Sequence, residues 1–216
     1  MAIDMKAMRA KLNALKSGGG KNNFWRPQDG DQDVRIVTPE DGDPFKDYWF
    51  HYNVGNNSGF LCPKKNFGDD CAICNFVRAL YDEGTEESVK MAKSLTGRQR
   101  FFSPVLVRGE EKQGVRIWGY GKTAYETLLT LVLNPDYGDI TDTDEGTDLT
   151  VNYGKPAGAS FPQTKIQPRR KTSRLVDSQE HIAELLNNIP AINGLFEKKT
   201  AEEVEALLDA FLSDDD

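Results

Sequence analysis

The three cysteines of the chain, Cys62, Cys71 and Cys74, fall within thirteen positions, and His51 lies shortly upstream. The resulting pattern is His-x10-Cys-x8-Cys-x2-Cys. Zinc in proteins prefers four tetrahedral nitrogen and sulfur ligands, and a Cys-x2-Cys turn presents two thiolates to one ion. Four protein ligands leave no open coordination position, which is typical of a structural metal. The pattern therefore predicts one structural Zn²⁺ ion held by these four residues.

The cysteines also allow three other interpretations. A disulfide would leave one thiol unpaired, and we expect a reducing compartment. A thioredoxin-like redox pair requires Cys-x2-Cys at the start of a β-α-β unit, and the sequence shows no such unit. The third alternative is three buried free thiols beside an unrelated histidine. His51 lies between Phe50 and Tyr52 and can have a packing role, in which case His181 is the only substitute ligand.

The formal charge of −7 is unevenly distributed along the 216 residues. Residues 88–133 contain 8 basic and 3 acidic side chains, and residues 149–176 contain 6 basic and no acidic ones. Residues 177–216 contain 2 basic and 11 acidic side chains. A nucleic acid responds to the local potential within about a Debye length and not to the charge of the whole chain. The acidic total therefore does not exclude a nucleic-acid partner.

Basic and aromatic residues alternate with aliphatic ones in the segment 114–120. Side chains alternate across a strand, so Val115 and Ile117 are expected on one face. Arg116, Trp118 and Tyr120 are expected on the other. A core face would not contain the arginine, and a merely solvated face would not contain the two aromatic rings. Stacking of a base on an aromatic ring contributes about 1–3 kcal/mol, and interleaved cations follow the backbone, so the pattern predicts a face that binds single-stranded nucleic acid.

A neighbouring strand and a third basic block extend this predicted face. Residues 100–108 show the same mixture on one side, while Phe101, Val105 and Val107 are expected to point inward. Residues 165–174 are rich in cations and contain no acidic residue, and a disordered basic loop is the alternative for them. The predicted contacts to DNA are Arg98, Arg100, Phe102, Arg116, Trp118, Tyr120, Lys122, Lys165, Arg169, Arg170, Lys171 and Arg174.

The hydrophobic periodicity predicts a β-rich α+β fold. Strands are expected over residues 34–38, 48–54, 100–108, 114–120, 148–153 and 164–167, and helices over 3–16, 72–81, 86–95, 122–133, 179–188 and 201–212. Three parts are expected: a basic N-terminal arm with a glycine linker (1–21), a DNA-binding core (22–176) and a helical acidic C-terminal segment (177–216). The zinc subdomain is expected at about 48–95 within the core.

The sequence shows no catalytic constellation, and we expect the protein not to be an enzyme. His-Glu-x-x-His is absent, and 2 histidines are too few for a three-histidine metal site. Residues 119–123 (GYGKT) resemble a phosphate-binding loop, but the complete motif needs glycine where the chain has Arg116. A zinc-ribbon adaptor that binds another protein of a replication or transcription complex is the alternative function.

No membrane partner is expected. No apolar run approaches the roughly 20 residues that a membrane-spanning helix requires. The first residues, MAIDMKAMRAKLNALK, have scattered charges and no apolar stretch of the kind found in secretion signals. These features favour an intracellular protein.

Taken in order, these motifs resemble the single-stranded-DNA-binding (helix-destabilising) protein family of T-even bacteriophages. The resemblance covers most of residues 8–175. His51, Cys62, Cys71 and Cys74 match the zinc ligands of the family in order, with somewhat shorter spacings. DVRIVTPEDGDPF resembles the first core strand and turn, and GRQRFFSPVLVRG and GVRIWGYGKTAYETLL resemble the strand pair and helix that line the DNA cleft.

The resemblance implies an OB-fold core with an inserted zinc-binding subdomain and peripheral helices. It implies a protein that coats and protects single-stranded DNA during phage DNA replication, recombination and repair, in the cytoplasm of the infected bacterial host. The implied partners are single-stranded DNA, neighbouring copies of the chain, and replication and recombination proteins that contact the acidic C-terminus. Self-association falls to the arm residues Arg9, Lys11 and Lys16, although Lys16-Ser17 replaces the tight Lys/Arg-Ser/Thr cluster of the family.

Overall fold

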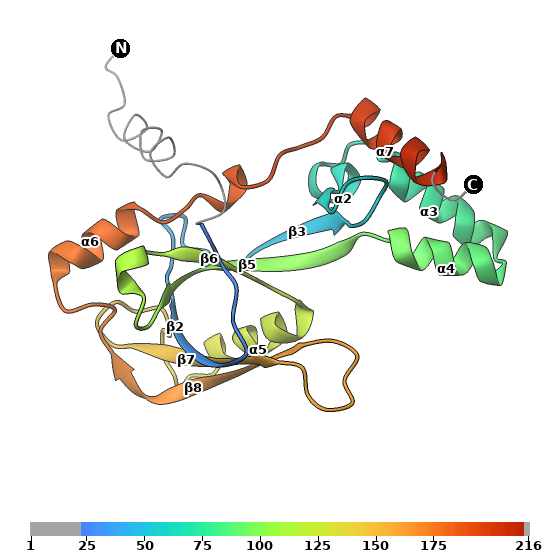
Figure 1. Cartoon of the computed structure of the whole chain (residues 1–216). Coiled ribbons are helices and arrows are strands. Elements are labelled where there is room, and N and C mark those ends of the chain that lie inside the picture. Colours follow the sequence, from blue (N-terminus) through green and yellow to red (C-terminus); the bar gives the residue numbers. More distant parts are fainter. Residues whose placement is uncertain (1–22, 214–216) are drawn as a thin grey trace, which may run out of the picture. The chain divides into compact units, whose positions relative to one another are not determined.

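The computed structural model describes residues 23–213, which fold into two compact units (Figure 1). Within this range, the first unit consists of residues 23–46 and 101–192, and the second of residues 47–100 and 193–213. The predicted arm (1–21), its helix (3–16) and the self-association residues Arg9, Lys11 and Lys16 lie outside the described residues. The predicted C-terminal segment is shared between the units, because residues 177–192 belong to the first and 193–213 to the second.

The first unit is built on a sheet with strand order β1-β6-β5-β2-β7-β8. Its neighbouring strands pair antiparallel, except β1 with β6, which are parallel. β8 was predicted to end at residue 167 but continues to Ser173, so the alternative of a disordered basic loop there is wrong. The strands are β1 (Phe24–Trp25), β2 (Gly30–Ile36), β5 (Arg98–Val107, its first three residues in the second unit), β6 (Arg116–Tyr120), β7 (Gly146–Gly154) and β8 (Gln163–Ser173).

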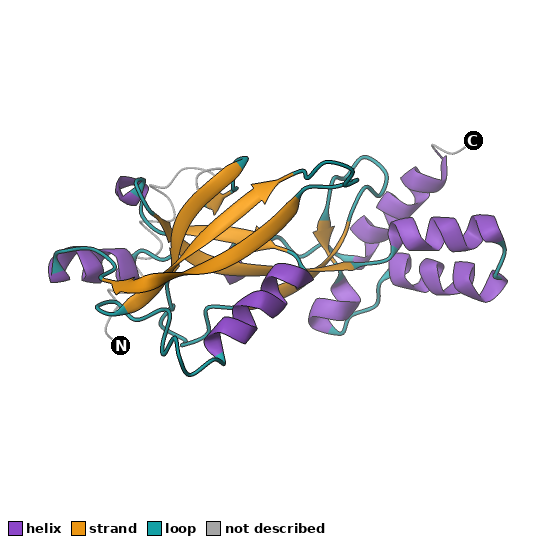
Figure 2. Cartoon of the chain, turned by 90° about the horizontal axis from the view of Figure 1, so that it is seen from below, coloured by secondary structure: helices purple, strands orange, loops and turns teal. Residues whose placement is uncertain are grey.

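Two helices of the first unit bury apolar side chains against the strands. α5 (Lys122–Val132) contributes Ala124, Leu128 and Leu131 to one hydrophobic cluster, which also contains residues of β2, β5, β6 and β7. α6 (Gln179–Asn187) contributes Ile182 and Leu185 to a second cluster, which also contains Leu106 of β5. The buried positions recur every three or four residues, which is the period of an amphipathic helix. Figure 2 shows α5 running alongside the strands.

Arg35 of β2 is fully buried and ties β7 and β8 together. Its guanidinium donates hydrogen bonds to the carbonyl oxygens of Gly146 and Ser173, both at 2.9 Å, and pairs with the Asp148 carboxylate at 2.9 Å. Asp148 also accepts two hydrogen bonds from Arg108, at 2.8 and 3.0 Å. A Cβ atom at Gly146 would lie 2.5 Å from the Arg35 guanidinium, so glycine leaves the room that this network needs.

The second unit combines short strands with helices. α7 packs onto this unit, because Val204 is fully buried in one hydrophobic cluster with Val54 and with Leu80 of α3. Thr200 and Glu203 form a capping box at the start of α7, with backbone N–H groups donating to the partner side chains at 2.8 and 3.2 Å. The elements are β3 (Lys46–His51), β4 (Phe60–Leu61), α2 (Pro63–Phe67), α3 (Ala72–Glu83), α4 (Glu86–Leu95) and α7 (Ala201–Ser213).

The described residues thus form a sheet-rich α+β structure, as predicted. Short 3-10 turns, η1 (Glu111–Gln113) and η2 (Ile192–Gly194), occupy two of the connections. Within residues 23–213, no helix has both the length and the apolar composition that crossing a bilayer requires.

Candidate metal centre and nucleic-acid interface

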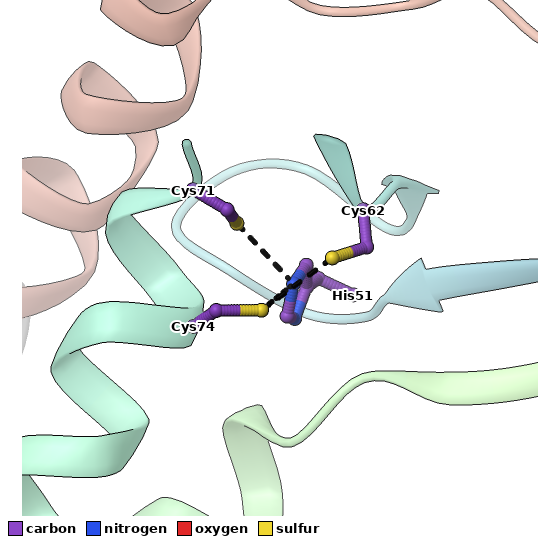
Figure 3. Close-up of side chains that lie close together, drawn as sticks. All are labelled: His51, Cys62, Cys71 and Cys74. Carbon is purple, nitrogen blue, oxygen red and sulfur yellow. Dashed lines mark hydrogen bonds between the residues drawn. The ribbon is translucent and has the colours of Figure 1, made fainter. Parts of the chain in front are cut away.

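Four side chains of the second unit converge on one point (Figure 3). His51 is the last residue of β3, Cys62 precedes α2, and Cys71 and Cys74 lie at the start of α3. Their possible ligand atoms all lie within 4.8 Å of one another. Nε2 of His51 is 3.5 Å from the sulfur of Cys74 and 3.6 Å from that of Cys71, and the sulfurs of Cys62 and Cys74 are 3.4 Å apart. The residues predicted as ligands therefore form a cluster that can hold a metal ion.

The orientation of His51 suits a metal ligand. Its Nδ1 atom lies 2.9 Å from the carbonyl oxygen of Leu95. Because a carbonyl can only accept, Nδ1 must carry the proton of this hydrogen bond, so Nε2, which faces the sulfurs, is the nitrogen that can bind a metal once it has lost its own proton. Metal-bound histidines commonly donate their second ring nitrogen to a backbone carbonyl in this way. The alternative ligand His181 lies on α6 of the first unit and is not part of the cluster.

Helix starts and one asparagine place the sulfurs. Cys62 is the N-cap of α2, and its sulfur lies 3.4 Å from the backbone N–H of Lys65. Asn66 of α2 donates to the carbonyl oxygens of Trp49 and Cys62 at 2.7 and 2.8 Å, which fastens α2 to β3. Cys71 is the N-cap of α3, so its sulfur lies at the start of that helix. One nitrogen and three sulfur donors form a set that zinc accepts.

The cluster perturbs the ionisation of its own members. Burial lowers the pKa of His51, but hydrogen bonds with Cys62 and Cys71 outweigh burial and raise that pKa to about 9. Hydrogen bonds from Cys71 and Cys74 lower the pKa of the Cys62 thiol, whereas those with Cys62 and Cys71 raise the pKa of Cys74. The neighbours thus favour the thiolate form of Cys62 and the thiol form of Cys74. A divalent cation displaces the remaining protons, because thiolates and neutral imidazole are the forms that bind metals.

The predicted DNA-binding face of β6 is buried. Trp118 and Tyr120 are only 1% and 2% exposed. Phe102 of β5 and Arg116 of β6 are 6% and 9% exposed. A ring must present a free face to stack on a base. The prediction that these four side chains point toward solvent is therefore wrong.

Core packing and local charge pairing explain the alternation in β6. The parallel pairing of β1 with β6 places Trp25 opposite Trp118, and the two rings meet edge to face at 5.7 Å. Arg116 pairs, at 2.5 Å, with Glu110, which lies in the turn that precedes β6. Burial raises the pKa of Tyr120, whose hydroxyl lies 2.6 Å from Oγ of Ser103. The arginine therefore does not mark an open face.

We expect Trp118→Phe to lower the free energy of unfolding by about 1–3 kcal/mol, because it leaves a gap in a closely packed core. The affinity of the folded variant for oligo-dT should equal that of the unchanged protein. Urea denaturation and a binding isotherm on the same preparation measure both quantities. A loss of affinity without a loss of stability would restore Trp118 as a contact to DNA.

β8 presents its cations on an irregular stretch of strand. Thr147 pairs with Thr172 and Leu149 with Pro168, so three residues of β8 lie opposite the single residue Asp148 of β7. These three residues are Arg169, Arg170 and Lys171, and all of them are exposed. A bulge of this kind leaves the extra residues unpaired and redirects their side chains.

The other polar residues of the predicted interface also lie at the surface. Arg169 pairs with Asp33, and Arg174 pairs with Asp144 at 2.9 Å. Lys122 has an exposed side chain, 3.6 Å from Glu126. The exposed members are Arg98, Lys122, Lys165, Arg169, Arg170, Lys171 and Arg174, and Arg100 is half-buried.

Two groups of residues were not foreseen from the sequence. Arg35 and Asp148 form the buried ion pair beside β8. The only hint of it in the sequence was the charged Arg35 inside the apolar segment VRIVT. Asn66 donates to the carbonyl oxygens of Trp49 and Cys62 beside the metal cluster. No local pattern marks the pairing of Arg35 with Asp148, because the two residues lie far apart along the chain, and nothing in the sequence singles out Asn66.

Comparison with known proteins points to one family. The family model described as gp32 DNA binding protein like matches residues 28–213 of the chain. A search of curated proteins finds no match. The matched range includes the metal cluster, all the strands from β2 to β8, and α7.

Proposed function

Because the chain belongs to the gp32-like family of DNA-binding proteins, we propose that it binds and coats single-stranded DNA without sequence preference. The observation that carries this proposal is the row of exposed cations on β8, in a chain of such a family. Residues 149–176 contain no acidic side chain that would neutralise this row from within the same segment. The proposal gives the chain no catalytic role.

The cations of β8 are suited to contact phosphates. Lys165, Arg170 and Lys171 take part in none of the salt bridges of the described residues. A protein that neutralises phosphates releases the counterions condensed on the nucleic acid, which makes binding sensitive to salt and independent of sequence. Arg169 and Arg174 are held by surface acids, and such pairs contribute only about 0–1 kcal/mol, so phosphates can compete for them.

We propose an OB-fold for the first unit. Antiparallel pairing joins the five strands β2, β5, β6, β7 and β8. Along the chain, α5 lies between β6 and β7. An OB-fold is a partly open, five-stranded barrel that binds oligonucleotides on its sheet face and with the loop between its last two strands. In this chain that loop contains Phe161, whose side chain is 78% exposed. The exposed ring of Phe161 can stack on a base, whereas the buried rings of Trp118 and Tyr120 cannot.

We propose that the ion of the second unit is Zn²⁺, one per chain, held by His51, Cys62, Cys71 and Cys74. The ligand cluster joins β3, α2 and α3, so the ion would contribute folding free energy to this unit. All four positions come from protein side chains, which leaves the ion structural.

The family also suggests the biological setting. We propose a role in phage DNA replication, recombination and repair in the cytoplasm of the infected bacterium, with neighbouring copies contacting through Arg9, Lys11 and Lys16. Replication and recombination proteins would contact the acidic C-terminal segment. In α7 the side chains of Glu205 and Asp209 are exposed and available for such contacts, whereas those of Glu202 and Glu203 interact with Thr200.

We expect Arg170→Ala and Lys171→Ala each to reduce the slope of log K against log salt for oligo-dT by about 0.7, which is the value for one phosphate contact on a single strand. Lys112→Ala is the matched control, because Lys112 is an exposed cation of the same unit outside the proposed interface. Fluorescence anisotropy of a labelled oligo-dT across a salt series provides the slopes. Equal slopes for all three variants would remove β8 from the interface and favour the alternative function, a zinc-containing adaptor for another protein.

A further inference from the structure

Residues 193–213 of the second unit contact the elements that carry the metal ligands, and we call them the C-terminal strap. The first of these elements is β3. The ring of Phe196 meets the ring of Phe50 edge to face at 5.1 Å and lies 5.5 Å from the ring of Tyr48. Phe50 directly precedes the ligand His51, so the strap supports the strand at the histidine.

The strap also holds the segment between two of the cysteine ligands. Nζ of Lys198 pairs with the carboxylate of Asp69 at 2.5 Å, and it lies 4.7 Å from the centroid of the Phe67 ring. Phe67 ends α2, which begins after its N-cap Cys62, and Asp69 lies two residues before Cys71. One lysine side chain therefore fastens the connection from the first of these ligands to the second.

α7 supplies the third contact by apolar packing. Val204 is fully buried in the hydrophobic cluster that contains the ligands Cys62 and Cys71. The backbone of α7 also lies directly against Gly55, where a Cβ atom would be 2.9 Å from the carbonyl oxygen of Leu207. Glycine at this position lets the two backbones approach each other closely. The helix and two of the ligands thus share one packed core.

We propose that docking of the C-terminal strap and retention of the metal ion are coupled, so that undocking of α7 loosens the ion. This inference rests on the proposed zinc site and adds a regulatory element to it. The ligands come from separate elements, β3, the start of α2 and the start of α3, and these must be held together before one ion can bind all of them. Because the strap contacts each of these elements, it lowers the entropic cost of assembling the site.

The coupling acts in both directions. The factor by which the docked strap raises the affinity for the metal is also the factor by which the metal raises the docking equilibrium of the strap. A protein that binds α7 only in its undocked form would therefore weaken the hold on the ion. Loss of the ion would in turn release α7.

The test measures the affinity of the full chain for Zn²⁺ by competition with a chromogenic chelator. Lys198→Ala should lower this affinity by about two- to tenfold, because it removes an exposed ion pair and a cation–π contact. Val204→Ala should lower it by about tenfold, because it leaves a gap in the shared core. Lys198→Arg should keep the affinity, because arginine can make both contacts.

Two matched controls separate the strap from ordinary losses of charge or packing. Lys199→Ala removes the neighbouring lysine, which pairs with Glu203 inside the strap, and should leave the affinity for the metal unchanged. Leu185→Ala leaves a gap in the first unit and should lower the temperature of thermal unfolding without changing that affinity. Hydrogen exchange of the unchanged protein tests the reverse direction, since chelation should speed the exchange of the α7 amides.

Three results would overturn the inference. Affinities of Lys198→Ala and Val204→Ala that equal that of Lys199→Ala would separate the strap from the metal and leave the proposed zinc site intact. Exchange of the α7 amides that chelation does not change would do the same. An unchanged protein that binds no metal would end both the inference and the proposed zinc site.

Discussion

Replacing Cys71 by serine is expected to release the metal ion and unfold the second unit while the first unit stays folded. Cys71 is 1% exposed and belongs to the hydrophobic cluster that joins α3, α4 and α7. The binding free energy of a structural zinc is about 10–16 kcal/mol in zinc-finger peptides, and much of it is folding free energy. This is as large as the whole stability of a typical domain, about 5–15 kcal/mol. The two hydrophobic clusters of the first unit contain none of the residues of that cluster.

Hydrogen exchange resolves the two units in this experiment. Amides of α3 and α4 should lose protection in Cys71→Ser and after chelation of the metal, while those of β2, β5 and β7 should keep it. His181→Ala is the control, because His181 lies outside the cluster and its loss should leave one metal ion bound per chain. Full protection of α3 and α4 in a metal-free protein would show that the second unit does not need an ion.

Asp148→Ala is expected to lower the free energy of unfolding of the first unit by about 3–5 kcal/mol, the usual cost of removing one partner of a buried ion pair. Burial lowers the pKa of Arg35, and the charge of Asp148 is the largest effect that opposes this. The variant would leave the fully buried guanidinium without its carboxylate. β8 would also lose one attachment, since the hydroxyl of Ser173 donates to the Asp148 carboxylate at 3.2 Å.

Urea denaturation of two further variants separates the buried pair from an ordinary loss of charge. Asp33→Ala removes a carboxylate that is 29% exposed, pairs with the exposed Arg169 and accepts one hydrogen bond from Thr150, so we expect a loss of only about 1–2 kcal/mol. Arg35→Met combined with Asp148→Ala should cost less than the sum of the single variants, because it removes both charges together. Equal effects of Asp148→Ala and Asp33→Ala would mean that the buried network contributes no more than a surface pair.

The sequence was sufficient for the metal cluster, the family and most of the elements. Cysteine and histidine spacing identifies ligands because few residue types bind zinc and because the turn of Cys-x2-Cys is local. The four side chains accordingly meet in the structure. The period of buried residues likewise predicts α5 and α6, since each helix has one apolar face. The resemblance to a DNA-binding family is confirmed by the match over residues 28–213.

The spacing of residues in the sequence did not predict which aromatic side chains are exposed. Alternation along β6 separates its two faces correctly, but it does not say which of them another segment covers. Trp25 covers Trp118 from a short strand that no periodicity predicts, and Glu110 neutralises Arg116 from the preceding turn. Arg35 was missed for the same reason, because its partner Asp148 lies far along the chain. In each case the surroundings of the side chain depend on contacts with other segments, which the local sequence pattern does not contain.

We propose that this chain binds single-stranded DNA through phosphate contacts. The most direct test measures the affinity of the full, metal-loaded chain for a labelled oligo-dT and for a duplex of the same length across a salt series. We expect tighter binding of the single strand, and a log K that falls linearly with log salt with a slope of about −0.7 for each phosphate contact. Binding that prefers the duplex, or that does not change with salt, would contradict the account.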